Sequence, residues 1–97
     1  MLLNISQQDQ TVLFSGKLNR DTLMLYSPFS LLNRLSGQVT FDFSALTHVD
    51  SAGLAWLIQQ LARARTLNLQ IEFTHVPAQL LSLAKVSAVT AILPIID

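Results

Sequence analysis

The chain has 97 residues, which is enough for one domain with a single core and too few for two. Just over half of the residues (51%) are apolar and only 12% are charged, so a core is well supplied and some apolar surface is expected to stay exposed. Six basic residues balance six acidic ones, which disfavours direct binding to nucleic acid or to an anionic lipid surface.

The composition also limits the location and the metal chemistry of the chain. Because the sequence has no cysteine, it can form neither a disulfide nor a thiolate metal site, which suits a reducing compartment. The first ten residues lack the basic and long apolar segments of an export signal. Uncharged stretches such as 51–62 and 86–96 are shorter than the roughly 20 apolar residues that span a bilayer. We therefore expect a cytoplasmic protein without direct membrane insertion.

The first third of the chain predicts a β-hairpin followed by a helix. Apolar and polar residues alternate over 3–5 and 12–14, on either side of a polar turn at 7–10, and Gly16 breaks this pattern. Residues 19–36 are predicted to form a helix that Asn19 or Asp21 caps, that Pro28 interrupts and that ends at Gly37.

The remainder of the chain predicts strands that alternate with helices. Alternation over 38–44 indicates a central strand, and apolar residues at helical spacing predict a helix over 50–66 with Asp50 as its N-cap. Residues 69–73 alternate as a further strand, Pro77 suits the first turn of a last helix, and Pro94 marks the tail. Strands joined by helices form largely parallel sheets, so the order ββαβαβα predicts a single α/β domain over 1–97, with a mixed, largely parallel sheet packed against helices.

The segment around Ser51 carries the candidate chemistry. The sequence F-D-F-S-A-L-T-H-V-D-S-A-G-L-A-W-L (41–57) leads from a buried strand into a helix that starts with Asp50, Ser51, Ala52 and Gly53. Unpaired N–H groups and the positive end of the helix dipole favour an anion there, so a phosphate on Ser51 would be tolerated. The small residues at 52 and 53 would also permit close approach of another chain. The simpler interpretation, which the pattern alone favours, is that Asp50 and Ser51 cap the helix, contributing about 1 kcal/mol. Capping and docking are compatible.

Trp56 is the second candidate for contact with a partner. On a helical wheel it projects with Gln59, Gln60 and Arg63, away from the apolar stripe that contains Leu54. This placement predicts an exposed tryptophan close to Ser51. Tryptophan is enriched in the residues that dominate binding energies, although single apolar side chains on surfaces are also ordinary.

Catalytic and metal-binding interpretations are disfavoured. His48, Asp50 and Ser51 lie too close along the chain to form a triad without folding back, and no G-x-S-x-G sequence surrounds the serine. His48 and His75 have no acidic or thiol companions at ligand spacing, so no metal site is expected. No glycine-rich phosphate loop is present, and no cofactor is expected. Asp42, on the polar side of a central strand, is predicted to support the site by accepting hydrogen bonds from the loop that leads to Ser51.

The sequence V-D-S-A-G-L-A (49–55), preceded by F-D-F-S (41–44), resembles the signature loop of STAS domains, and the resemblance runs nearly end to end. It implies the STAS fold. In the anti-sigma factor antagonists of this superfamily, a partner kinase phosphorylates the serine that corresponds to Ser51. In the MlaB group, the corresponding serine or threonine contacts an ABC transporter ATPase. Many anti-sigma factor antagonists have a second serine where this chain has Ala52, which weakens that alternative.

Further features are more similar to the MlaB group: the short length, G-K-L-N-R-D-T-L at 16–23, A-R-A-R at 62–65, L-A-K-V at 83–86 and I-L-P at 92–94. This resemblance implies a non-catalytic accessory subunit of the Mla phospholipid transporter, cytoplasmic and held at the inner membrane by its partners. It would bind the ATPase MlaF, in a complex with permease and MCE-domain subunits. The expected partner-binding residues are Asp50, Ser51, Ala52, Gly53, Ala55, Trp56 and Gln59. The alternative is an anti-sigma factor antagonist whose partner kinase phosphorylates Ser51.

Overall fold

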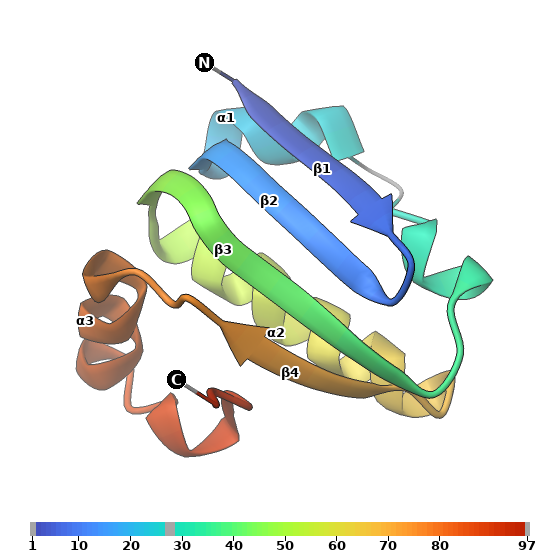
Figure 1. The fold of residues 1–97 in the computed structure, drawn as a ribbon. Coiled ribbons are helices and arrows are strands. Elements are labelled where there is room, and N and C mark those ends of the chain that lie inside the picture. The colour runs from blue at the N-terminus through green and yellow to red at the C-terminus, as the bar shows by residue number, and fades with distance from the viewer. Residues whose placement is uncertain (1, 27–28, 97) are drawn as a thin grey trace.

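A computed structural model describes residues 2–26 and 29–96 (Figure 1). The strands are β1 (Leu3–Gln8), β2 (Thr11–Leu18), β3 (Gln38–Val49) and β4 (Gln70–Thr74). The α-helices are α1 (Arg20–Leu23), α2 (Ser51–Thr66) and α3 (Ala78–Val86). Three short 3₁₀ helices complete the described elements: η1 (Met24–Tyr26), η2 (Leu31–Arg34) and η3 (Thr90–Ile92). None of the helices described here is long and apolar enough to cross a membrane.

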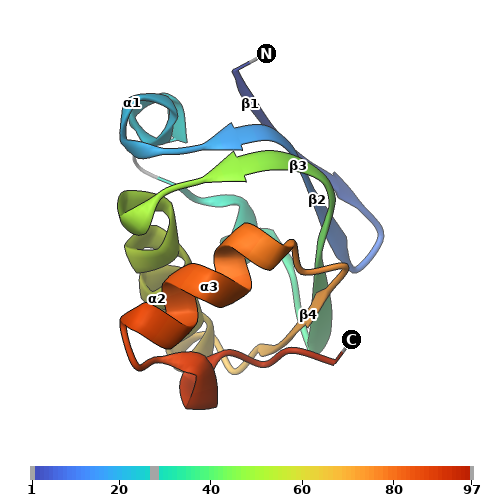
Figure 2. The same cartoon turned by 90° about the vertical axis from the view of Figure 1, so that its left-hand side faces the viewer.

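The strands form one sheet in the order β1-β2-β3-β4. The hairpin pairs β1 with β2 in antiparallel fashion, whereas β3 is parallel to both β2 and β4. The predicted mixed, largely parallel α/β architecture is therefore confirmed. The two views agree that α1 and α2 lie on the same face of the sheet, and none of the described helices covers the other face (Figures 1 and 2).

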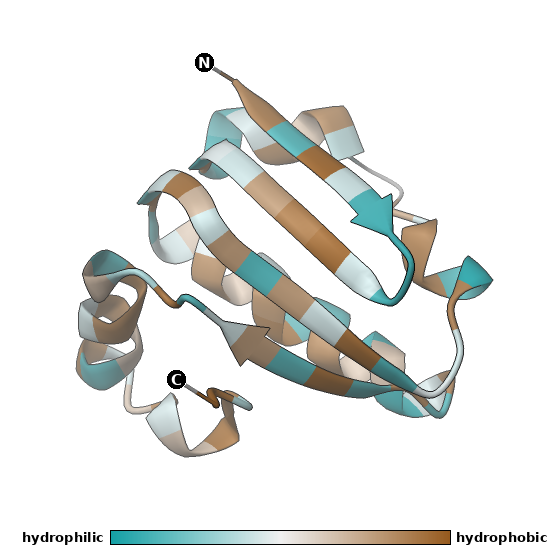
Figure 3. Cartoon of the chain, in the orientation of Figure 1, coloured by the Kyte–Doolittle hydropathy of each residue, from teal (hydrophilic) through white to brown (hydrophobic). Residues whose placement is uncertain are grey.

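The core lies between the sheet and α2 and is rich in phenylalanine. Along the first part of β3, apolar residues alternate with polar ones, as the sequence predicted (Figure 3). Phe43 stacks on Phe14 at 4.9 Å between ring centroids, and Phe41 stacks on Phe73 at 5.6 Å. Burying each such ring contributes roughly 1.5–3 kcal/mol. These ring contacts join three neighbouring strands on the face that α2 covers, and Phe14 also meets Trp56 of α2.

Strand β3 is longer than predicted and continues to Val49. The strict alternation stops at Ser44 and Ala45, which are both exposed, and burial resumes at Leu46. Its register with β2 shifts between Leu13 and Ser15 and again after Gly16, so bulges absorb the change of phase. The predicted break at Gly16 is wrong, because β2 and its alternation of buried and less buried residues continue through it to Leu18, although Gly16 has a φ of 90°. As a result, Asp50 alone separates β3 from α2.

The single helix predicted over 19–36 is wrong. The chain forms α1, η1 and η2 instead, and the predicted interruption at Pro28 falls outside the described residues. This segment has contacts with both the sheet edge and α2. The Tyr26 hydroxyl accepts a hydrogen bond from Ile5 N at 3.0 Å and donates one to Leu3 O at 3.3 Å, while Phe29 packs on Trp56. A regular helix could not follow both surfaces, so these contacts outweigh local helical propensity.

The last strand and helix agree closely with the prediction. β4 spans Gln70–Thr74, and Pro77 stands at the N-cap of α3. Beyond η3, the tail returns to β4: Phe73 N donates to Pro94 O at 2.8 Å, and Ile96 N donates to Phe73 O at 3.0 Å. The tail therefore pairs with the outer edge of β4.

Helix α2 lies very close to the end of β2 at Gly53. A Cβ atom added there would lie 2.4 Å from Leu18 O and 3.0 Å from Cγ2 of Val49. Real Cβ atoms do not come so near to main-chain oxygen atoms. Glycine is therefore required at this position by the distance between the helix and the strand, although Gly53 is in an ordinary helical turn.

We predict that Gly53→Ala destabilises the protein, by about 1–3 kcal/mol, because α2 must move away from β2. Alanine in place of glycine within a helix ordinarily stabilises a protein by up to about 1 kcal/mol. A loss of stability would therefore show that close packing, and not helix propensity, decides the residue at this position. Chemical denaturation of both proteins measures it. The control is Ala55→Gly, at an exposed position of the same helix, which measures the effect of helix propensity on stability without a change in packing. A Gly53→Ala protein that is more stable than the wild type would contradict the close packing.

Candidate functional site

Asp50 joins three elements at the start of α2. Its Oδ1 accepts a hydrogen bond from Gly53 N at 2.9 Å, which confirms the predicted N-cap. Its Oδ2 accepts one from Arg20 N at 3.1 Å, at the start of α1, and its own N–H donates to Leu18 O at 3.2 Å. The end of β2 and the first turns of α1 and α2 are therefore fixed relative to one another.

The predicted partner-binding residues fall into two groups. Ser51, Ala55 and Gln59 are exposed and share one side of α2, because they are four residues apart. Ala52 and Asp50 are half-buried beside them. We call the exposed group the α2 stripe. It is uncharged, with one hydroxyl, one methyl and one amide group, and it begins at the first residue of the helix.

Gly53 and Trp56 are buried, contrary to what the sequence predicted. Gly53 faces Leu18 and Val49 of its own chain, so its small size serves an internal contact. Trp56 is only 9% exposed. Its ring meets Phe14 at 6.2 Å and Phe29 at 5.0 Å between centroids, both edge-on. The helical wheel correctly placed Trp56 with its neighbours on one side of α2. It could not show that side chains from other elements, among them Leu23, Met24, Tyr26 and Phe29, lie over that side.

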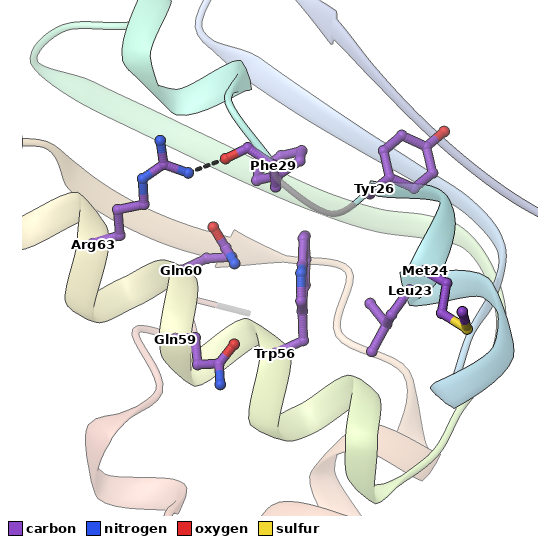
Figure 4. A pocket seen from close by; sticks show the side chains of 8 residues that line it. All are labelled: Leu23, Met24, Tyr26, Phe29, Trp56, Gln59, Gln60 and Arg63. Carbon is purple, nitrogen blue, oxygen red and sulfur yellow. Dashed lines mark hydrogen bonds between the residues drawn. The ribbon is translucent and has the colours of Figure 1, made fainter.

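A pocket of about 370 Å³ remains where this segment covers α2 (Figure 4). Its walls are Leu23, Met24, Tyr26, Phe29, Trp56, Gln59, Gln60 and Arg63. The Arg63 guanidinium donates to Phe29 O and, at 2.8 Å, to Asn33 Oδ1. These bonds tie the covering segment to the helix. The sequence pointed to the four residues on α2 but gave no signal for the opposite wall.

The predicted role of Asp42 is wrong. Its Oδ1 accepts a hydrogen bond from Ser44 N at 2.9 Å and lies 3.4 Å from Nδ1 of His75. Asp42 lies on the face of the sheet that α1 and α2 do not cover, opposite Thr74 in the register. With about 3.3 Å per residue along a strand, it lies roughly 20 Å from the end of β3 that leads to Ser51. The extra length of β3, which the sequence did not reveal, separates the two.

The geometry offers a surface for contact and no group of ligands for a metal ion. Among residues 2–26 and 29–96, no three histidine or acidic side chains come together in a way that could hold one. Both carboxylate oxygens of Asp50 accept main-chain N–H groups. They are therefore committed to structure, which argues against a role as the acid of a His48–Asp50–Ser51 triad.

Comparison with known families decides which group of proteins this site belongs to. The family model described as "Mlab, STAS domain" matches residues 1–94. The chain belongs to this STAS domain family. STAS domains are generally regulatory or accessory modules that bind other proteins. No curated protein matches the STAS domain described here closely enough to count as a relative.

Two solved structures share the fold of this STAS domain. The anti-sigma factor antagonist SpoIIAA, in its unphosphorylated form, is 12% identical with a TM-score of 0.66, over 98% of this chain and 87% of that one. A putative anti-sigma factor antagonist from Thermotoga maritima is 15% identical with a TM-score of 0.76, over 98% of this chain and 86% of that one. At these identities, the likeness establishes the fold alone.

Trp56→Ala is predicted to destabilise the isolated domain by about 3–5 kcal/mol, as expected for removing a buried aromatic side chain. Trp56→Phe should cost less, because it keeps most of the contact with Phe14 and Phe29. Denaturant unfolding followed by circular dichroism measures both changes. An unchanged midpoint for the alanine variant would mean that the ring is on the surface after all.

Asp50→Ala should lower the unfolding free energy by about 1–2 kcal/mol, because it leaves the N–H groups of Gly53 and Arg20 without their acceptor. Asp50→Asn keeps an oxygen acceptor and should retain most of the stability. Thermal melts of the pair test whether Asp50 acts through these hydrogen bonds. Equal losses in the two variants would show instead that the negative charge is what matters.

Proposed function

We propose that this STAS domain is a non-catalytic accessory subunit of a phospholipid-transporting ABC complex of the Mla type. In this proposal, it docks on the ATPase subunit through the α2 stripe and supports the assembly and activity of that subunit. The ATPase in turn belongs to a complex with permease and MCE-domain subunits, which holds the domain at the membrane. The proposal rests on the MlaB description of the matching family and on the exposed stripe.

The observation that carries the proposal is the combination of a rigid base and an uncharged, exposed edge at the start of α2. Asp50 and Gly53 fix the first turn against β2, so Ser51 is presented from a helix start that is hydrogen-bonded and closely packed. A preorganised surface loses little conformational entropy on binding. Small, uncharged groups also cost little to desolvate, which suits a contact between two proteins.

A second candidate function is that of an anti-sigma factor antagonist. Two observations favour it: both similar structures carry that description, and Ser51 is exposed where a kinase could reach its hydroxyl. A phosphate there would add nearly two negative charges at the positive end of the helix dipole. The two functions would use the same surface, and they differ in the partner.

The partner is identified by capturing the tagged chain from cells that express it at native level. Recovery of an ABC ATPase together with an MCE-domain protein is expected under the transporter proposal. Recovery of a protein kinase of the anti-sigma type, with phosphate on Ser51 by mass spectrometry, would replace it with the alternative.

Substitutions at Ser51 should weaken binding to the ATPase in the order Thr, Ala, Asp, with Asp weakest. Ser51→Thr keeps the hydroxyl and should bind almost normally. Ser51→Ala loses a hydrogen bond worth about 1 kcal/mol, and Ser51→Asp places a carboxylate in the interface that must lose its water. Titration calorimetry with the purified ATPase measures the affinities.

Melting curves of the three variants provide the control for folding. The helix dipole should tolerate the carboxylate of Ser51→Asp, so this variant should keep its fold and much of its stability. Ser82→Asp, at an exposed position of α3, adds the same charge away from the stripe and should bind like the wild type. Equal affinities for the wild type and Ser51→Asp would show that Ser51 is not part of the contact. Its role would then be limited to the start of the helix.

A further inference from the structure

The pocket beside the α2 stripe contains polar atoms that lack partners. Gln60 is 6% exposed, and its buried Oε1 accepts no hydrogen bond from any described residue. Leaving such an oxygen unsatisfied costs about 1–3 kcal/mol, which is unusual in a stable domain. The indole of Trp56 contacts Phe14 and Phe29 through its ring. Its N–H is not among the buried polar atoms that lack a partner, and it makes no hydrogen bond to the described residues, so it is open to an acceptor from outside. One acceptor and one donor are therefore left over on neighbouring turns of α2.

The described lining of the pocket also carries a positive charge and no negative one. Its lining contains Arg63 and no carboxylate. The guanidinium donates to the carbonyl oxygen of Phe29 and the amide oxygen of Asn33, which are uncharged, so its positive charge is not neutralised by these bonds. Residues 51–66 of α2 include a second arginine, Arg65, and no acidic residue. An anionic group that enters the pocket would meet Arg63 as the one charged side chain among its described lining residues, beside an aromatic wall.

The pocket adjoins the α2 stripe, and exposed apolar side chains lie at its edge. Met24 lines the pocket and is 79% exposed, and its neighbour Leu25 is 59% exposed. Gln59 belongs both to the lining and to the stripe. A protein that rests on the stripe would therefore cover the mouth as well, with Met24 at the rim (Figure 4).

We propose that the pocket receives an acidic anchor residue of the docked partner protein, and this inference rests on the proposed function. The stem of that residue packs between Met24 and Trp56, and its carboxylate faces the Trp56 N–H and Arg63. Charge complementarity with Arg63, the indole N–H and an aromatic wall together select a glutamate or aspartate over a purely apolar anchor.

The first test needs no partner, because Trp56 is the one tryptophan of the sequence and gives a single indole N–H signal in a ¹⁵N–¹H spectrum. The probe is 4-phenylbutyrate, which joins an aromatic stem to a carboxylate, and the matched control is its neutral amide. The carboxylate should shift the Trp56 signal saturably and bind roughly tenfold more tightly than the amide. No saturable shift, or equal binding by the two compounds, would overturn the inference.

The second test reverses the charge at the rim. Met24 is exposed, so Met24→Glu and Met24→Lys should both fold like the wild type, as melting curves will show. Met24→Glu should weaken binding of the ATPase roughly tenfold, whereas Met24→Lys should stay within about threefold of the wild type. The same pair at Val86, which is 87% exposed on α3, should have no effect.

The outcomes separate the two proposals. Equal losses for Met24→Glu and Met24→Lys would mean that the rim packs without regard to charge, and the acidic anchor would be wrong. Normal binding by both would remove the pocket from the interface, while the Ser51 series could still support docking through the stripe. If the wild type does not bind the ATPase at all, the proposed function fails, and the Trp56 titration alone decides whether the pocket selects a carboxylate.

Discussion

The close packing of α2 against the end of β2 is the constraint on which the rest of the structure depends. Gly53 allows the helix to approach the Leu18 carbonyl, and Asp50 fixes its first turn to the main chain of its neighbours. A helix held at its first turn projects its remaining side chains in fixed directions. The phenylalanine core, the covered Trp56 and the exposed stripe all follow from that one placement.

Much of the fold could be predicted because it depends on local periodicity. The alternation over 38–44 and over 69–73 locates two strands, and helical spacing from Asp50 onward locates α2. The segment 19–36 could not be predicted in the same way, since its shape depends on where Tyr26 and Phe29 must lie relative to β1 and α2. Contacts between residues far apart in sequence decide its path, and a helical pattern does not report them.

The candidate site was predicted in part for the same reason. Asp50 and Ser51 were found because capping residues and a helix start are local signals, and the short motif around them resembles STAS domains. Trp56 was misplaced because a helical wheel gives the direction of a side chain and says nothing of what covers it. Asp42 was misplaced because the length of β3 depends on bulges opposite β2, which no alternation in β3 alone reveals.

The hydroxyl of Tyr26 has a consequence for how this domain associates with other proteins. It forms hydrogen bonds with the N–H of Ile5 and the carbonyl of Leu3, which face away from β2 at the outer edge of β1. At the opposite edge of the sheet, the tail forms hydrogen bonds with the N–H and carbonyl of Phe73 on β4. Unpaired strand edges invite another chain to add a strand, in functional complexes and in aggregates alike. These bonds occupy the start of β1 and the end of β4. A foreign strand would have to displace them to extend the sheet there, which favours recognition through the helical side of the molecule.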